Sequence, residues 1–589
     1  MILPTMTTSA NESAKSSDIK PGAKRGPKRG PKGRVVDSAA QQELRTLLGD
    51  APRDAALLIE YLHLIQDHYR QISPAHMVAL AAELRLATAQ VFEVATFYHH
   101  FDVVKDAGQL APTCTVRVCN GLSCKMAGAD SLLQQLQQLQ QLQQLQQSDP
   151  DSTVRVMAAP CIGRCDQAPA VCVGQNAFGP ATSAQVQQAV DSAQTAAPAL
   201  DFLPNAFAAS RYTMLAQCLT RKLSVQQAIA TLSGAGLRGL GGAGFPTGRK
   251  WSIVRAMAGP RMMAVNIDEG EPGTFKDRWY LENQPQQFLE GMLIAAWAVD
   301  VSAIYIYLRD EYHAIRAVLQ RELAALADNL APLLAQSHWV LPEIHLRRGA
   351  GAYICGEESA MIDSIEGKRG LPRLRPPYVA EVGIFNYPTL VQNMETLFWV
   401  PRLLREGAIS FSKYGLNGRV GLRSFSVSGR VRWPGVVVAP AGISLRQLIE
   451  EYCGGMQEGH TLYAYLPGGA SGGILPASMA DLPLDFDTLQ PHGCFIGSAA
   501  VVVLSQHDSA RDAALNAMEF FKHESCGQCT PCRVGTEKAV QLLKQPQWNL
   551  PLLQELSQVM QDASICGLGQ AAPNPVLSVI KFFPHEVQS

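Results

Sequence analysis

Three cysteines spaced three residues apart constrain the fold of this chain more than any other feature. Cys526, Cys529 and Cys532 lie in the stretch ESCGQCTPCR, and Cys566 follows in ICGLG. A tight loop can supply three thiolates to one metal centre, with a fourth from elsewhere in the chain. A Cys₄ zinc site more usually has two separate Cys-x-x-Cys pairs. The spacing therefore favours a [4Fe–4S] cluster over zinc, and disfavours disulfides.

Two further cysteine pairs each follow a short predicted strand. Residues 115–119 and 154–157 alternate as strands do, and each runs into a cysteine loop. Four thiolates on two strand–loop units suit a [2Fe–2S] cluster, whereas zinc knuckles favour shorter and more alike spacings. Cys114 and Cys172 flank the set and are interpreted as bystanders. The predicted ligands are Cys119, Cys124, Cys161 and Cys165.

Cysteine usage and apolar runs indicate the compartment. Fourteen cysteines in 589 residues are too few for a disulfide scaffold, and most fall in ligand-like clusters, which predicts a reducing environment. The longest apolar run, near residues 292–301, is too short to span a bilayer and is interrupted by Asp300. The N-terminus lacks the apolar core of a secretory signal. We therefore expect a cytoplasmic protein with no membrane contact.

Two segments have low complexity. Residues 1–37 are rich in Pro, Gly, Lys and Arg, which predicts a disordered basic tail. Such a tail binds phosphate nonspecifically, but nothing downstream supports a nucleic-acid partner. Residues 133–147 repeat Leu-Gln-Gln, a period that drifts around a helix of 3.6 residues per turn. We predict a solvent-exposed helical insertion there rather than a coiled coil.

The remaining sequence divides into five parts. The pattern changes along the chain. Apolar residues at helical spacing come first, strands alternating with helices follow, and a helical run ends the chain. Alternating strands and helices predict an α/β sheet with its ligand crevice at the strand ends. The expected parts are a helical N-terminal part (38–108), a cysteine-bearing domain (109–198), an α/β domain (205–423), a β-grasp-like domain (424–508) and a helical bundle (509–589).

A glycine-rich loop opens the α/β part. Gly239, Gly241 and Gly244 satisfy G-x-G-x-x-G, but a Rossmann motif needs a preceding strand, and residues 225–232 look helical. We interpret the stretch as a phosphate or flavin loop outside the Rossmann context. Glycines let backbone N–H groups approach a pyrophosphate, and Lys250 adds positive charge.

Acidic residues follow two of the predicted strands. In isolation such clusters are more often metal or salt-bridge sites, but no histidine accompanies them. Their pairing with a glycine-rich loop favours a nucleotide, because ribose hydroxyls need acceptors. The polar residues concerned are Asn266, Asp268, Glu269, Glu271, Glu357 and Glu358.

Four motifs, in this order, carry a resemblance to a known family: GLGGAGFPTG, NIDEGEPGTFKD, GAYICGEE and ESCGQCTPCR. The chain resembles a fusion of two electron-input subunits of respiratory NADH:quinone oxidoreductase (complex I). Residues 40–195 are similar to its small thioredoxin-like [2Fe–2S] subunit, and residues 205–585 to its NADH-binding flavoprotein. The resemblance implies a multidomain α/β protein that binds FMN, NAD(H), a [2Fe–2S] cluster and a [4Fe–4S] cluster.

The resemblance also implies which residues bind the nucleotides. For FMN these are Gly239, Gly241, Lys250, Asn266, Asp268, Tyr353, Glu357 and Asn393. For NAD(H) they are Phe245, Glu271, Glu358, Arg375 and Tyr378. Arg238, Gly242, Gly244, Glu269, Gly356, Gln392 and Thr396 complete the predicted cofactor site. Gln392, Arg375 and Tyr378 replace the family's usual Asn, Lys and Phe, and Gln392 puts one flavin-phosphate contact in doubt.

The fusion itself most resembles the β (diaphorase) subunit of cytoplasmic NAD-dependent formate dehydrogenases. This implies a catalytic α subunit carrying a molybdenum or tungsten pterin and iron–sulfur clusters as the partner. Because nicotinamide passes a hydride and a cluster takes single electrons, a flavin must stand between them, and no side-chain acid or base is expected. Alternatives are a diaphorase subunit of an NAD-reducing hydrogenase or a complex I-like NADH dehydrogenase. A nonenzymatic iron–sulfur or zinc scaffold is a third, which flavin absorbance would reject.

Overall fold

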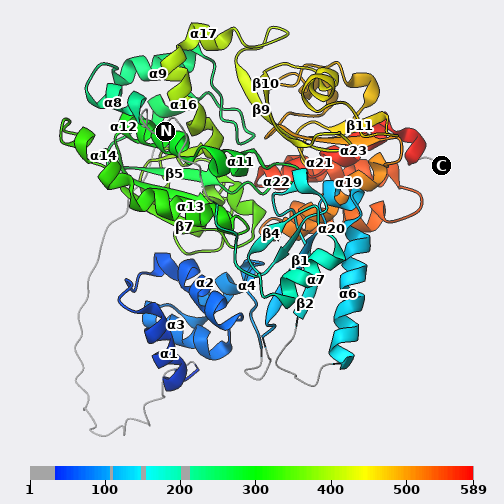
Figure 1. The fold of residues 1–589 in the computed structure, drawn as a ribbon, viewed down its shortest axis with the longest axis horizontal. Coiled ribbons are helices and arrows are strands. Elements are labelled where there is room, and N and C mark those ends of the chain that lie inside the picture. The colour runs from blue at the N-terminus through cyan, green and yellow to red at the C-terminus, as the bar shows by residue number, and fades with distance from the viewer. Residues whose placement is uncertain (1–33, 106–110, 147–153, 201–211, 588–589) are drawn as a thin grey trace, which may run out of the picture.

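The computed structural model describes residues 34–105, 111–146, 154–200 and 212–587. The basic tail predicted over residues 1–37 lies almost wholly outside the described residues. Figure 1 shows the N-terminal helices beside the α/β part, with the cysteine-bearing domain, the β-grasp part and the C-terminal helices grouped on the other side. No helix in the described ranges is long and apolar enough to cross a membrane.

The N-terminal part is helical, as predicted, and buries Leu44, Leu62 and Leu80 completely. Asp37 caps the first helix, and Ser73 caps the third, where Pro74 occupies the first turn. Its helices are α1 (Ser38–Leu48), η1 (Ala55–Leu57), α2 (Leu58–Tyr69), α3 (Pro74–Leu84) and α4 (Thr88–Phe97).

The cysteine-bearing domain is a four-stranded sheet in the order β2–β1–β3–β4, with β1 parallel to β2 and antiparallel to β3. Helix α6 protrudes from it (Figure 1). Residues 134–141 are mostly exposed and helical, as predicted for this insertion, but Leu136 is buried because the first turns of the helix pack on the sheet. The elements are β1 (Cys114–Cys119), α5 (Leu122–Met126), α6 (Ala129–Gln146), β2 (Val154–Ala159), η2 (Cys165–Gln167), β3 (Val171–Val173), β4 (Asn176–Phe178) and α7 (Ser183–Asp191).

The α/β domain has a parallel sheet in the order β7–β6–β5–β8. The apolar run noted near residues 292–301 belongs to the buried helix α12, which packs against α16. The strands are β5 (Arg261–Ile267), β6 (Val301–Leu308), β7 (Glu343–Arg348) and β8 (Thr389–Asn393). The helices are α8 (Thr213–Leu219), α9 (Val225–Gly234), α10 (Thr247–Ala256), α11 (Lys276–Asn283), α12 (Pro285–Val299), α13 (His313–Ala324), α14 (Leu326–Leu334), η4 (Tyr353–Gly356), α15 (Glu358–Ile365), η5 (Ile384–Asn386), α16 (Met394–Glu406) and α17 (Ala408–Ser412).

The next part has the β-grasp arrangement that the sequence predicts. A hairpin, β9–β10, precedes a short helix, and the last strand returns parallel to β9 at the centre of the sheet β10–β9–β13–β11–β12. Its elements are β9 (Leu422–Gly429), β10 (Gly435–Pro440), α18 (Leu445–Gln447), η6 (Leu448–Tyr452), β11 (Leu462–Leu466), β12 (Leu475–Pro476), η7 (Ala477–Met479), η8 (Gln490–His492) and β13 (Ala500–Ser505).

The C-terminal part is a helical bundle, as predicted. Ser509 caps its first helix, and Pro531 lies in the first turn of the second, so the cysteine motif runs across a helix start. The helices are α19 (Ala510–Glu524), α20 (Thr530–Leu543), α21 (Leu550–Ala563), α22 (Gly567–Ala571), α23 (Asn574–Phe582) and η9 (Pro584–Glu586).

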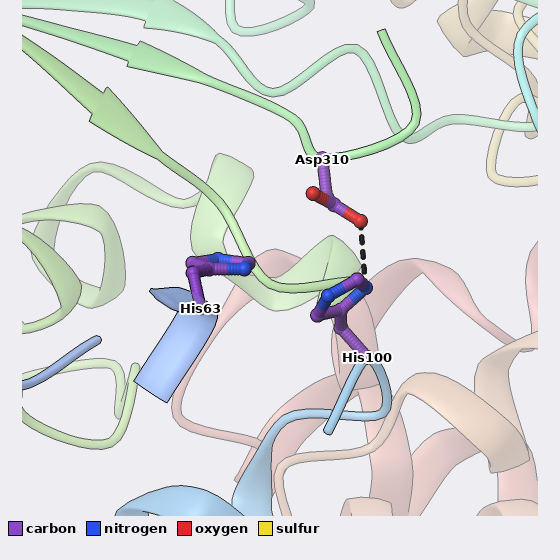
Figure 2. A group of neighbouring side chains, drawn as sticks. All are labelled: His63, His100 and Asp310. Carbon is purple, nitrogen blue, oxygen red and sulfur yellow. Dashed lines mark ion pairs between the residues drawn. The ribbon is translucent and has the colours of Figure 1, made fainter. Parts of the chain in front are cut away.

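A buried polar network fastens the N-terminal helices to the α/β domain (Figure 2). His100, after α4, lies with Nδ1 2.7 Å from a carboxylate oxygen of Asp310, which follows β6. Arg348 donates to the other oxygen of Asp310 at 2.5 Å. His63 on α2 donates Nε2–H to the carbonyl of Gly349 at 2.9 Å. Although burial opposes it, the charges of His100 and Arg348 hold the pKa of Asp310 well below its usual range.

Candidate functional site

The glycine-rich loop joins α9 to α10 with no strand before it, as predicted. The amide of Gly239 donates to the carbonyl of Phe245 at 2.8 Å, which closes the loop on itself. A Cβ on Gly241 would lie 3.1 Å from the Cβ of Asn393, so only glycine fits against the end of β8 without displacing it. The loop therefore presents backbone at the carboxyl edge of the sheet, where α/β proteins bind ligands.

Two adjoining cavities of about 570 and 700 Å³ lie along this loop. They share Gly241, Asn266, Gly356, Glu357 and Asn393. The first also contains the predicted residues Gly242, Asp268, Glu269, Glu271 and Tyr353. The second also contains Gly239, Gly244, Phe245, Lys250, Glu358, Arg375, Tyr378 and Gln392. Residues far apart in the sequence thus meet in one place, as the motifs predict.

The residues of these cavities fit FMN chemically. Asp268 Oδ2 and Gln392 Oε1 are buried acceptors with no hydrogen-bond partner among the described residues. Burial raises the pKa of Asp268 well above its usual range, so a hydrogen-bond donor from a ligand would favour its ionised form. The ribityl hydroxyls of FMN are donors of the required kind. Gln392 therefore remains a candidate contact, although it departs from the family's usual residue.

The first cavity has an ordered acidic wall. Glu271 accepts hydrogen bonds from the Tyr353 hydroxyl at 2.5 Å and from the Ser471 amide and hydroxyl at 2.7 Å. Ser471 belongs to the β-grasp part, so this part closes over the cavity. Burial raises the pKa of Glu271. The carboxylate is fixed in place and can orient a bound nucleotide rather than move protons freely.

The second cavity combines aromatic faces with paired charges. Phe245 is 39% and Tyr378 53% exposed, so their rings are available for stacking. Arg375 lies 3.1 Å from Glu358, which is also 3.8 Å from Lys250 Nζ. A base or nicotinamide ring can stack here beside carboxylates that accept ribose hydroxyls.

Two predicted site residues lie outside both cavities. Thr396 is fully buried, and its hydroxyl accepts the Leu240 amide at 2.9 Å, so it supports the loop from behind. Arg238 donates to the Gly244 carbonyl at 2.5 Å and pairs with Asp487. The structure differs from a direct-contact prediction at these two positions, because both side chains are turned toward protein.

The C-terminal thiols converge beside the first cavity. Cys526 and Cys529 precede α20, Cys532 lies in its first turn, and Cys566 immediately precedes α22. The charge of Cys529 acts on Cys526 and Cys532, and both of these act on Cys566, so the four are neighbours. Burial raises the pKa of Cys532 to about 11 and of Cys566 to about 12. Residues 567–568, directly after Cys566, line the first cavity.

The second thiol set is equally compact and fully buried. Cys161 Sγ lies 3.3 Å from Cys165 Sγ. Hydrogen bonds to Cys124 and Cys161, with burial, hold the pKa of Cys119 well above its usual range. Thiols this close share protons, which a metal centre displaces when it binds. Both sets of four therefore fit the clusters that their spacing predicts.

The Cys161–Cys165 loop is fastened to the wall of the first cavity. Arg309 donates to the Cys161 carbonyl at 2.7 Å, and Arg278 donates to the Gly163 carbonyl at 2.9 Å. Tyr312 packs against Gly163 and donates its hydroxyl to Glu269 at 2.8 Å. Both thiol sets therefore adjoin the first cavity, one through residues 567–568 and the other through this loop.

A buried ion network under the first cavity was not predicted from the sequence. Lys276 Nζ lies 2.9 Å from Glu395 and 3.2 Å from Asp277, and Asn393 donates to Asp277 at 2.9 Å. All three charged side chains are nearly fully buried. The stretch FKD is a local signal for part of it, but Glu395 comes from a distant helix. The network fixes Asn393 against the glycine-rich loop.

Burial gives Glu269 an expected pH signature in protein stability. Desolvation, then the charge of Asp277, raises its pKa from 4.5 to about 7. The native state therefore holds a proton that the unfolded state releases, so the contribution of Glu269 to stability is fully present below pH 4.5 and is lost as pH rises through about 7. The contribution is at most about 3 kcal/mol.

We expect Glu269→Gln to flatten this fall, measured as the thermal midpoint between about pH 5 and pH 8. Glu537, an exposed carboxylate on α20, provides the matched control Glu537→Gln. An equal pH slope in wild type and Glu269→Gln would contradict the assignment.

Three family descriptions match successive parts of the chain. "Thioredoxin-like [2Fe-2S] ferredoxin" matches residues 44–194, and "Nuo51 FMN-binding domain" matches residues 232–402. "NADH-ubiquinone oxidoreductase-F iron-sulfur binding region" matches residues 512–589. These matches confirm the predicted multidomain fold class and the predicted cofactors FMN, NAD(H), [2Fe–2S] and [4Fe–4S].

Known proteins resemble the chain over most of their own length. The mitochondrial NADH-ubiquinone oxidoreductase 51 kDa subunit of Neurospora crassa is 40% identical over 375 residues, which cover 61% of this chain and 76% of the relative. NADH dehydrogenase [ubiquinone] flavoprotein 1 of Dictyostelium discoideum is also 40% identical, over 60% of this chain and 76% of the relative. A chain from the crystal structure of an NAD⁺-reducing [NiFe]-hydrogenase in the H₂-reduced state is 30% identical, with a TM-score of 0.78. The match covers 91% of this chain and 93% of the hydrogenase chain.

Proposed function

Since the chain belongs to the family of the 51 kDa flavoprotein of NADH-ubiquinone oxidoreductase, we propose that it is the β (diaphorase) subunit of an NAD-dependent formate dehydrogenase. At the level of the family it is an NADH:FMN/iron–sulfur electron-transfer subunit of complex I-like enzymes. In the proposed complex, a separate α subunit with a molybdenum or tungsten pterin oxidises formate, and this chain reduces NAD⁺. We propose the cytoplasm as its compartment.

One observation carries the proposal: two four-thiol sets adjoin a single nucleotide-sized cavity. When bound, FMN exchanges a hydride with NAD(H) and single electrons with iron–sulfur clusters. The chain's own contribution is positioning. Gly241 and Asn393 bring backbone against the cavity, and Asp268 offers an unpaired acceptor.

The nicotinamide nucleotide would occupy the second cavity. Phe245 and Tyr378 offer rings for stacking, and Glu358 offers an acceptor for ribose hydroxyls. Glu271 offers a further acceptor from the adjoining first cavity. No group need abstract a proton from carbon, so fixed carboxylates such as Glu271 suffice. Thr396 and the network around Lys276 hold the loop and Asn393 rigid, which keeps the nucleotide in register.

The site predicts a preference for NAD(H) over NADP(H). A 2′-phosphate would meet the Glu358 carboxylate, and like charges in contact cost several kcal/mol. We expect Glu358→Ala to raise kcat/KM for NADPH relative to NADH by about tenfold or more, because the carboxylate that repels the phosphate is removed while Arg375 stays beside it, paired with Glu357 at 2.5 Å. Glu381→Ala, on the rim of the same cavity, is the control. Comparable turnover of wild type with both nucleotides would sink the idea.

A second candidate is the diaphorase subunit of an NAD-reducing hydrogenase. The likeness to the chain of an NAD⁺-reducing [NiFe]-hydrogenase over 91% of the present chain favours it. The two candidates differ only in the partner. Purifying the chain with its native partner and assaying NAD⁺ reduction with formate against hydrogen decides between them. Reduction with hydrogen alone would overturn the formate assignment.

A further inference from the structure

A third cavity, of about 470 Å³, lies apart from the nucleotide site. It is lined by the N-terminal helical part, the [2Fe–2S] domain, the β6–α13 connection and the end of α19. Two clusters of histidine and carboxylate side chains face it. They differ in whether their carboxylate is already satisfied.

The first cluster is the network of Figure 2, and its carboxylate has no free oxygen. Asp310 bonds His100 through one oxygen and Arg348 through the other. A cation there would have to displace Arg348. This cluster therefore acts as an internal fastening.

The second cluster is open. His99 and His523 stack with ring centroids 4.1 Å apart, and Glu524 lies beside them. One donor atom from each of the three lies within 4.8 Å of the others. Glu524 is only 6% exposed, yet it accepts one hydrogen bond, from the Tyr353 amide at 2.9 Å, and has no ion pair among the described residues. That bond goes to Oε2, so Oε1 is left to face the two rings.

The chemistry of these three groups suits a metal ion. Two imidazoles and one carboxylate are the donor set of divalent first-row metals with open coordination positions. Bonds of about 2.0–2.2 Å place neighbouring donors roughly 3–4 Å apart. The two rings stack at an interplanar angle of 26°, so one of them must turn out of the stack before both nitrogens reach one ion, and both side chains are exposed. Burial lowers the pKa of His99 to about 4, so its imidazole is neutral and offers a lone pair at neutral pH. The cavity provides the entry path.

We propose that His99, His523 and Glu524 bind one divalent transition-metal ion of the zinc type. None of its ligands is a cluster cysteine or lines the nucleotide cavities, although Glu524 lies two residues before Cys526. Its ligands come from the segment after α4 and from the end of α19, so the ion joins the N-terminal helices to the [4Fe–4S] bundle. Water fills the remaining positions in the cavity.

The test uses the full chain, purified without a histidine tag and with both clusters and FMN loaded. The protein is stripped with a mild chelator, dialysed against Zn²⁺, and analysed for zinc by mass spectrometry, normalised to cluster iron. We expect one tightly held zinc per chain, with its affinity lowered at least about tenfold in His99→Ala and in His523→Ala. His68→Ala, an exposed histidine on α2 outside the cavity, is the matched control and should keep the zinc.

Two further readings keep the result decisive. The visible spectrum of the clusters and flavin should be unchanged in His99→Ala, which separates loss of zinc from loss of fold. The double variant should lose little more affinity than either single variant, because the two histidines share one ion and their effects are not additive. If the wild type binds no zinc, or if both single variants retain it, the proposal is overturned.

Discussion

A Cys566→Ser variant should lose the [4Fe–4S] cluster, keep the [2Fe–2S] cluster and stop exchanging electrons with its partner. Cys566 is the one ligand of the C-terminal set that comes from outside the Cys526–Cys532 loop. Removing an outer-shell partner of a metal site typically costs about 10–100-fold, so loss of a ligand should cost more than about 100-fold in partner-dependent NAD⁺ reduction. NADH oxidation by a dye that takes its electrons at the flavin does not need the cluster, so this activity should fall far less.

The measurements are iron content, the low-temperature electron paramagnetic resonance of the reduced protein, and the two activities. Cys114→Ser is the matched control, because Cys114 flanks the [2Fe–2S] set without belonging to it. It should retain both cluster signals and both activities. Survival of the [4Fe–4S] signal in Cys566→Ser, with full partner-dependent activity, would refute the ligand assignment.

The sequence predicted those parts of the site that depend on residues close together in the chain. The three cysteines at intervals of three identify one cluster, and the helix before Gly239 correctly removes the loop from the Rossmann class. Strand β8 went unpredicted because it is short and ends in the polar pair Gln392–Asn393. Its place in the sheet comes from pairing with β5, which is a tertiary effect. Yet this strand supplies the residues against which the loop packs.

Long-range partners account for the other differences. Glu395 and Lys276 are far apart in the sequence, and neither position signals the ion pair. Thr396 was predicted to belong to the cofactor site, whereas its hydroxyl accepts the Leu240 amide, a contact that no local sequence signal marks. In the Leu-Gln-Gln helix, period alone predicted exposure, but the first turns find a sheet to pack on. Periodicity shows which residues share a face of the helix, but the packing of neighbouring elements determines which of them are buried.

The glycine-rich loop leads to the second large expected effect. Gly244 has φ +66°, and a Cβ there would lie 2.8 Å from the ring of Phe486. That ring cannot move away easily, because two guanidinium groups pack on it. The guanidinium carbons of Arg238 and Arg423 lie 4.5 and 4.0 Å from the ring centroid. Left-handed strain of about 1–2 kcal/mol adds to an overpacking cost of about 1–3 kcal/mol in Gly244→Ala.

The loop can relieve this cost only by moving, and Gly244 lines the cavity that adjoins the FMN site. We therefore expect Gly244→Ala to bind FMN at least about tenfold more weakly, since about 1.4 kcal/mol corresponds to a factor of ten. Titration of flavin into the deflavinated protein measures this directly. Gly418→Ala is the control for left-handed strain outside the loop, because Gly418 has φ +75° with nothing within 4 Å of its Cβ position and lines neither cavity. It should bind FMN within about twofold of wild type. If both variants weaken FMN equally, general destabilisation rather than the loop accounts for the loss; if neither does, the loop does not hold the flavin.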